Sequence, residues 1–265
     1  MPAPLSVVIL TKDEEDRLPA ALASVTFADE VVVADTGSTD ATEERARLAG
    51  ARFVPIGWDG FVGSRNRALA LARHDWVLVL DADERIPEAL RHEILAALDA
   101  GDAAFAGYRM PRLSYFLGRP IHHGSWYPDY KMRLGRGSRG LRAEGGRVHE
   151  ALVVDGPLGR FAAPLIHHPY RDFSDALRKA ARYAELGAQD RYDRGLRGST
   201  MGLFVRPAFE FIRSLVFKRG FLDGTVGWSV AFLHASSYFL RAAFLLEIQR
   251  RSGNDRGQNP RRRLG

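Results

Sequence analysis

The chain has 265 residues, of which 46% are hydrophobic, enough to bury the core of one large or two small domains. It contains no cysteine, which excludes a disulfide framework and a thiolate metal site. The net charge of +6 favours anionic partners such as nucleotides, phospholipid headgroups, lipopolysaccharide phosphates or nucleic acid. The N-terminus lacks the basic stretch of a signal peptide, so we expect a cytoplasmic protein.

The first hundred residues alternate between strand and helix patterns. Apolar runs at 5–10, 30–34, 52–56 and 76–80 predict strands. Helices are expected after a capping box formed by Thr11 and Glu14, from 40 to 50, over 64–73 and from 87 to 101. This β-α-β-α-β-α-β-α order is typical of a doubly wound, mostly parallel sheet.

Polar clusters follow three of the predicted strands, at 11–14, 35–40 and 81–84. The carboxyl ends of parallel strands meet at one edge of a sheet, where ligands bind. Asp81 and Asp83 there make half a site for Mg²⁺ or Mn²⁺, with a substrate's phosphates completing the shell. The alternative is that one aspartate caps the next helix and the other is solvated. Because Gly-x-Gly-x-x-Gly and P-loop motifs are absent, a nucleotide would be held by side chains and a metal.

Three segments, Val7–Glu14, Val31–Asp40 and Trp76–Glu84, together with Arg65-Asn66-Arg67-Ala68, carry a family resemblance. Their order and spacing resemble the GT-A glycosyltransferases of family 2 over about residues 5–170. The segments Gly124–Asp129, Lys131–Leu134 and Val148–Glu150 are similar to the lipopolysaccharide-core β-glucosyltransferase type. One departure is Asp13, where such sequences usually carry Asn.

The resemblance implies an α/β, Rossmann-like GT-A catalytic domain over residues 1–170. Its nucleotide-sugar half covers about 1–101 and its acceptor half about 102–170. We expect a helical, membrane-associating extension over 171–252 and a basic, disordered tail over 253–265.

The resemblance also implies a donor site. Its base and ribose contacts would come from Thr11, Glu14 and Asp35, and its other donor contacts from Arg65, Asn66, Asp81, Ala82 and Asp83. The metal would be held by Asp83 and Asp81, with His168 as a further candidate ligand. The alternative for Arg65 is a solvated basic helix face.

A base that deprotonates the acceptor hydroxyl is the remaining requirement. Glu150 lies where the family often places its base, and Asp129, on a Pro-containing loop, is the rival. The alternative for Glu150 is a surface strand residue paired with an arginine.

The C-terminal third is helical in pattern. Residues 203–222 mix aromatic and aliphatic side chains with Arg206, Arg213, Lys218 and Arg219, and polar residues interrupt the apolar run over 225–246. This pattern predicts basic amphipathic helices in the interface of an anionic membrane. The alternative is that their apolar face packs on the catalytic domain or on a second subunit.

The resemblance therefore implies an inverting, metal-dependent enzyme, peripherally bound to the cytoplasmic side of the inner membrane. It would move a hexose, glucose from UDP-glucose, onto a lipopolysaccharide-core or other lipid-linked glycan acceptor. The alternatives are a nucleotidyltransferase and a non-catalytic scaffold. We expect no nucleic-acid partner, because three acidic clusters on one edge repel phosphates unless a metal intervenes.

Overall fold

The computed structural model describes residues 2–100, 104–146 and 150–257, which divide into two compact units. The first unit comprises Met1–Tyr115 with Pro128–Pro169, and the second Phe116–Tyr127 with Tyr170–Gly265. Residues 116–127, which the sequence analysis places in the acceptor half of the catalytic domain, thus belong to the second unit.

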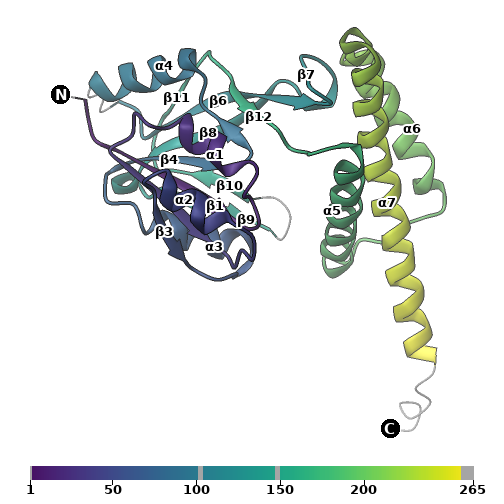
Figure 1. Cartoon of the computed structure of the whole chain (residues 1–265). Coiled ribbons are helices and arrows are strands. Elements are labelled where there is room, and N and C mark those ends of the chain that lie inside the picture. The colour runs from purple at the N-terminus through teal and green to yellow at the C-terminus, as the bar shows by residue number, and fades with distance from the viewer. Residues whose placement is uncertain (1, 101–103, 147–149, 258–265) are drawn as a thin grey trace, which may run out of the picture. The chain divides into compact units, whose positions relative to one another are not determined.

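The first unit is built on a mixed sheet (Figure 1). Its parallel half has the order β3-β2-β1-β4, from β1 (Leu5–Thr11), β2 (Glu30–Asp35), β3 (Arg52–Pro55) and β4 (Trp76–Asp81). The sheet continues with β8 (Asp129–Arg136), β6 (Gly107–Phe116), β12 (Leu165–His167) and β5 (Glu84–Arg85). Strand β8 is antiparallel to both β4 and β6. The first unit also contains β11 (Leu158–Arg160) and an antiparallel pair, β9 (Arg142–Gly145) with β10 (Glu150–Val153). Strand β7 (Arg119–Pro120) falls within the part of the chain assigned to the second unit.

Helices cover both faces of the parallel half. Helices α1 (Leu18–Ala23), α2 (Thr42–Leu48) and α4 (Glu88–Asp99) pack on one face, around Val7 and Ile9. Helix α3 (Gly60–Leu69) packs on the other face, around Val8. The five residues from Trp76 to Leu80 are at most 3% exposed, as expected for a strand buried on both sides.

Several predicted helix boundaries differ from the observed ones. The capping box is wrong, because the Thr11 hydroxyl donates to Asp35 Oδ1 (3.2 Å) while the Glu14 amide donates to Thr42 (2.9 Å). Contacts between the two loops therefore replace a local cap, and α1 begins later, at Leu18. Helix α3 begins at Gly60 instead of 64, and α4 ends at Asp99; Gly101 lies outside the described residues.

The second unit is helical, with α5 (Phe173–Asp193), α6 (Val205–Ile212) and α7 (Gly224–Gly257). Asp172 caps α5 by accepting a hydrogen bond from the Asp175 amide (2.6 Å). Helix α7 continues through Gly257, whereas the sequence analysis starts the disordered tail at 253; residues 258–265 lie outside the described part. Short helices are η1 (Gly124–Trp126), η3 (Met201–Leu203), η4 (Arg213–Phe217) and η5 (Gly220–Asp223), and η2 (Gly137–Arg139) belongs to the first unit.

Candidate active site

The loops that follow β1 and β2 are joined by hydrogen bonds. Asp13 Oδ1 accepts from the Thr39 amide (2.8 Å), and the Asp13 amide donates to Ser38 Oγ (2.8 Å). Asp13 has φ +54°, in the left-handed region that Asn and Asp tolerate better than other side chains. Aspartate in place of the family's asparagine is therefore compatible with the same loop backbone.

Asp35 organises the second of these loops. Its Oδ2 accepts from the amides of Gly37 and Ser38 (2.8 Å each), and its Oδ1 accepts from the hydroxyls of Ser38 (2.5 Å) and Thr11 (3.2 Å). Two predicted nucleoside contacts, Thr11 and Asp35, are thus in direct contact and buried.

A cavity of about 350 Å³ lies beside this loop, within the usual range of about 300–1,000 Å³ for small-molecule sites. It is lined by residues at the carboxyl ends of β2 and β3 and on α2, namely Asp35, Gly37, Ser38, Thr39, Asp40, Glu43, Arg47, Phe53 and Pro55. A ligand-sized space therefore exists at the sheet edge that the acidic clusters mark.

Asp81 and Glu150 are bridged by Arg65. Arg65 Nη2 donates to Asp81 Oδ1 (2.8 Å) and to Glu150 Oε1 (2.7 Å), and Arg65 Nε adds a second bond to Glu150 (3.1 Å). Arg65 is only 6% exposed, so it is not part of a solvated helix face. Glu150 pairs with an arginine, as expected for a surface strand residue. However, that arginine is the buried Arg65, which also bonds to Asp81.

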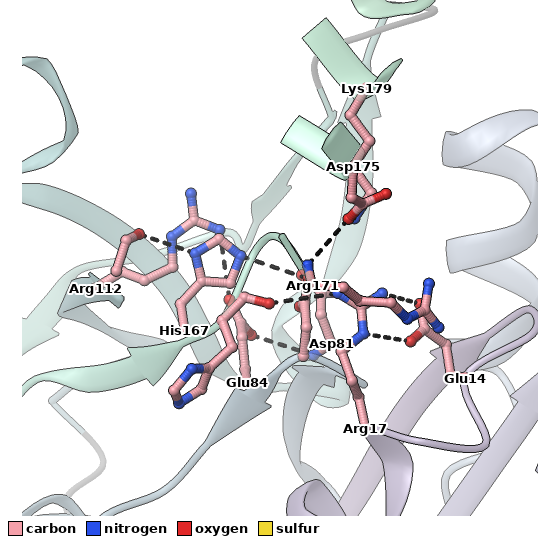
Figure 2. A network of polar contacts seen from close by, with 12 residues as sticks. Glu14, Arg17, Asp81, Glu84, Arg112, His167, Arg171, Asp175 and Lys179 are labelled. Carbon is pink, nitrogen blue, oxygen red and sulfur yellow. Dashed lines mark hydrogen bonds and ion pairs between the residues drawn. The ribbon is translucent and has the colours of Figure 1, made fainter. Parts of the chain in front are cut away.

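The bridge continues as an alternating series of acids and bases. Arg133 lies between Asp81 (2.5 Å) and Glu84 (2.6 Å). Arg112 lies between Glu84 (3.5 Å) and Asp129 (2.6 Å), and Figure 2 shows Glu84 between Arg112 and Asp81. Burial alone would raise the pKa of Asp81, but the charges of Arg133 and Arg65 hold it well below its usual range.

Three members of this series, Glu84, Arg112 and Arg133, are absent from the sequence-based site. The sequence pattern of β8 could have predicted Arg133. Asp129, Lys131 and Arg133 are spaced two residues apart, so they face the same side of the strand. No comparable pattern marks the fully buried Glu84.

Asp83 faces a histidine and an arginine. Its Oδ2 lies 3.7 Å from His167 Nε2 and 3.5 Å from Arg17 Nη1. The Ser114 hydroxyl, 2.9 Å from His167 Nδ1, holds the other side of the imidazole ring. Arg17 donates hydrogen bonds to both carboxylate oxygens of Glu14 (2.5 and 2.6 Å), as Figure 2 shows. Glu14, a predicted nucleoside contact, thus orients a cation toward Asp83.

His168 contributes its backbone at this point. Its amide donates to the Asp83 carbonyl (2.8 Å), while its ring packs against Tyr115 in a tilted arrangement with centroids 5.1 Å apart. Burial is the main cause that lowers the pKa of His168. Ala82, between the two aspartates, is 5% exposed.

The chemistry of these donors fits a divalent ion. Asp83 offers a carboxylate and His167 a ring nitrogen whose opposite side is fixed by Ser114, as metal-binding histidines require. Within residues 2–100, 104–146 and 150–257, no group of three or more such side chains could hold a metal ion. Mg²⁺ and Mn²⁺ are commonly bound by one or two carboxylates plus substrate phosphates, and an imidazole nitrogen favours Mn²⁺.

Asn66 makes both of its side-chain contacts with one residue of β9. Its amide nitrogen donates to the Ala143 carbonyl (3.1 Å), and its oxygen accepts from the Ala143 amide (2.7 Å). Ala143 pairs with Leu152 of β10, the strand that begins with Glu150. Asn66 therefore positions the strand pair that carries Glu150.

The two candidate bases differ in how fully their oxygens are engaged. Asp129 Oδ2 accepts two bonds from Arg112 and its Oδ1 lies 3.2 Å from Lys131 Nζ. Burial opposes ionisation of Asp129, but Arg112 and then Lys131 outweigh it and lower its pKa. Glu150 Oε2, in contrast, is buried without a hydrogen-bond partner among the described residues.

Two more atoms of the same cluster share this property. Arg65 Nη1 and Arg133 Nε are also buried and lack a hydrogen-bond partner in the described part of the chain. Buried polar atoms are almost always paired in folded proteins. Three exceptions in one cluster make it a candidate site for a polar ligand.

A mostly parallel sheet flanked by helices, with acids gathered at the ends of β1, β2 and β4, is the arrangement expected of the GT-A class. Residues 6–148 match the family described as glycosyl transferase family 2, and the chain belongs to this family. The predicted family, fold class and transferase activity are confirmed.

Several curated relatives match along nearly the whole chain. The lipopolysaccharide core biosynthesis glycosyltransferase LpsC of Rhizobium meliloti is 30% identical over 254 residues, covering 91% of this chain and 93% of the relative. An uncharacterized glycosyltransferase of Rickettsia typhi is 27% identical, covering 94% of this chain and 89% of its own. A solved structure of glucosyl-3-phosphoglycerate synthase from Mycobacterium tuberculosis, in complex with Mn²⁺, UDP and glucosyl-3-phosphoglycerate, aligns with a TM-score of 0.34 at 28% identity, over 44% of this chain and 45% of that one.

Proposed function

We propose that this protein transfers a hexose, glucose from UDP-glucose, to a lipopolysaccharide-core or other lipid-linked glycan acceptor. Family membership supports glycosyl transfer, and the relative named for lipopolysaccharide core biosynthesis supports this class of acceptor. The observation that carries the proposal is the Arg65 bridge, which sets Glu150, with its unpartnered Oε2, beside the acidic motif after β4.

The nucleoside half of the donor binds in the cavity beside the Asp35 loop. Thr11 and Asp35 hold the shape of that loop, and Glu14 fixes Arg17 near Asp83. Arg65 and Arg133 offer unpartnered N–H groups to the donor diphosphate, for which the planar guanidinium is well suited. Asp81 acts chiefly by orienting these two arginines.

Asp83 is the principal metal ligand, and we assign the histidine ligand to His167 in place of His168. The His167 ring, not the His168 ring, is the one paired with Asp83. A divalent ion held there supplies Lewis-acid stabilisation of the charge that develops on the departing diphosphate.

Glu150 is the base. The acceptor hydroxyl oxygen bonds to the anomeric carbon as the bond from that carbon to the diphosphate oxygen breaks, and the hydroxyl proton passes to Glu150 Oε2. A single carboxylate that deprotonates the nucleophile gives inversion, through an oxocarbenium-like state as in glycoside hydrolysis. Asp129 is a poorer candidate because Arg112 and Lys131 engage both of its carboxylate oxygens, whereas Glu150 keeps Oε2 without a partner among the described residues.

We propose that the enzyme works at the cytoplasmic face of the inner membrane, peripherally bound to an anionic surface, because a lipid-linked acceptor would be reached there. The basic stretches of the second unit support this location.

The test is a nucleotide-release assay on the full chain with UDP-, GDP- and dTDP-sugars, each with Mn²⁺, Mg²⁺ or EDTA. Because release without an acceptor is slow, a calorimetric titration of the same nucleotides accompanies it. We expect metal-dependent release of UDP from one sugar, abolished by Asp83→Ala and reduced about 10²–10⁴-fold by Glu150→Gln, the range for loss of a general base. Release of pyrophosphate would indicate a nucleotidyltransferase, and absence of both release and binding would leave a scaffold protein.

A further inference from the structure

The second unit exposes an apolar stripe along α6 and η4. Val205, Phe209, Ile212 and Val216 are spaced by four, three and four residues, so they share one side of the helix. Each is between 49% and 59% exposed, although side chains of this kind are normally buried.

A second stripe runs along α7. Trp228, Phe232 and Phe239 are 53%, 55% and 42% exposed. An apolar groove of about 490 Å³ lies between α6 and α7, and both Ile212 and Phe232 line it. The groove joins the two stripes into one surface, called here the α6–α7 face and made of Val205, Phe209, Ile212, Val216, Trp228, Phe232 and Phe239. Clustered exposure of this kind marks an interaction site.

The charges around this face are positive. Residues 194–246 contain seven arginines and lysines but only two acids, Glu210 and Asp223. Glu210 is fully buried between Arg206 (2.8 Å) and Arg213 (2.6 Å), and Asp223 accepts from the His123 amide (2.9 Å) with only 7% of its side chain exposed. The acids of the stretch are therefore internal, and its surface attracts anions.

By length and composition, the helical stretch Gly220–Ser252, which includes most of α7, is apolar enough to cross a membrane. However, α5 packs along this part of α7, with Ala176 near Val226 and Gly187 against Arg241. Eight of the 21 residues of α5 are charged. A spanning α7 would draw these charges into hydrocarbon at about 2.5–3.5 kcal/mol each at the membrane centre.

We propose that the α6–α7 face is an interfacial docking surface for anionic phospholipid, with α7 lying along the bilayer instead of crossing it. This inference rests on the membrane association proposed above and names the surface responsible. The apolar side chains enter the boundary between headgroups and acyl chains, and the surrounding arginines and lysines bind lipid phosphates. A second copy of the chain fits less well, because it would bring the same cations together.

The test is flotation of the full chain with phosphatidylglycerol–phosphatidylethanolamine vesicles and with pure phosphatidylcholine vesicles. We expect binding to the anionic vesicles only, weakened by salt, and reduced at least tenfold by the double substitution Phe209→Asp with Phe232→Asp. Leu48→Asp is the matched control, because Leu48 is 73% exposed on α2 of the first unit. Trp228 fluorescence should shift to the blue on binding, and Trp228→Phe should remove that shift.

Three results would overturn the proposal. The first is equal vesicle binding by the double variant and the wild type. The second is a concentration-dependent dimer that the double variant abolishes, with no vesicle binding, which would assign the face to a second copy. The third is resistance to alkaline extraction from membranes, which would make α7 a spanning helix. The UDP-release assay in detergent separates these results from a failure of the proposed function, because the double variant should keep wild-type release there.

Discussion

The Nη2 atom of Arg65 lies 2.7 Å from Oε1 of Glu150, across 85 positions of sequence. The same nitrogen lies 2.8 Å from Asp81 Oδ1. One guanidinium therefore fixes the distance between Asp81, the last residue of β4, and the proposed base, and it leaves Glu150 Oε2 available for another partner. Under the proposed function, this relationship makes α3 part of the catalytic site.

Replacing Arg65 by alanine should disable and destabilise the enzyme. Breaking a buried ion pair costs about 3–5 kcal/mol of unfolding free energy, and misplacing a catalytic group by about 1 Å can lower turnover about 10²-fold. Arg65→Lys should fall between alanine and wild type, because an ammonium cannot reproduce the planar fork. Turnover and urea unfolding measure the two effects.

Arg67→Ala is the matched control for this series. Arg67 is on the same helix, but its side chain is 45% exposed and lies 4.0 Å from Asp59. Arg67→Ala should leave turnover and the free energy of unfolding near their wild-type values. An Arg65→Ala variant as active as Arg67→Ala would contradict the role given to the bridge.

Asn66→Ala should loosen the strand pair that carries Glu150. The lost pair of hydrogen bonds to Ala143 is worth about 1–3 kcal/mol, and we expect a lower kcat with unchanged UDP affinity. Asn66→Asp keeps the acceptor for the Ala143 amide but loses the donor, so its effect should be intermediate. Faster hydrogen exchange at the Ala143 amide is the signature, and unchanged exchange would count against a positioning role.

The sequence predicts the parallel half of the sheet well, because a buried strand such as 76–80 leaves an unbroken apolar run. The sequence does not predict which side chains pair with Asp81. Arg65 and Arg133 reach it across 16 and 52 positions, and only the tertiary fold brings them together. Adjacent strand residues face opposite sides, so sequence alone also does not decide between His167 and His168.

Asp13→Asn should be tolerated, whereas Asp13→Ala should not. Both Asp and Asn supply an oxygen to the Thr39 amide and both tolerate the left-handed backbone at φ +54°. Alanine loses the bond and adds about 1–2 kcal/mol of backbone strain. Urea unfolding distinguishes the variants, and an alanine variant as stable as wild type would refute this explanation.

Acid should destabilise the protein through His234. Burial is the main cause that lowers its pKa, with Arg213 and Lys218 acting in the same direction against Glu210. As the pH falls below the ordinary value of 6.5, the unfolded chain takes up a proton that the folded chain resists, so the free energy of unfolding falls.

The thermal midpoint measured from pH 7.5 to 5 tests this dependence. His234→Gln should make the decline shallower, while His92→Gln, at a side chain 72% exposed on α4, should leave it unchanged. An equally steep decline in His234→Gln would assign the acid sensitivity to other groups.

Calorimetric titration of UDP into the full chain, with Mn²⁺ and then with EDTA, is the most direct test of the proposed donor site. We predict that UDP binds in the presence of Mn²⁺ and that EDTA abolishes this binding. Asp83→Ala and His167→Ala should each weaken UDP binding at least about tenfold, the lower range for loss of metal-site contacts. Asp129→Asn should leave UDP binding unchanged. UDP binding of equal strength in EDTA and in Asp83→Ala would contradict a metal-assisted donor site at the end of β4.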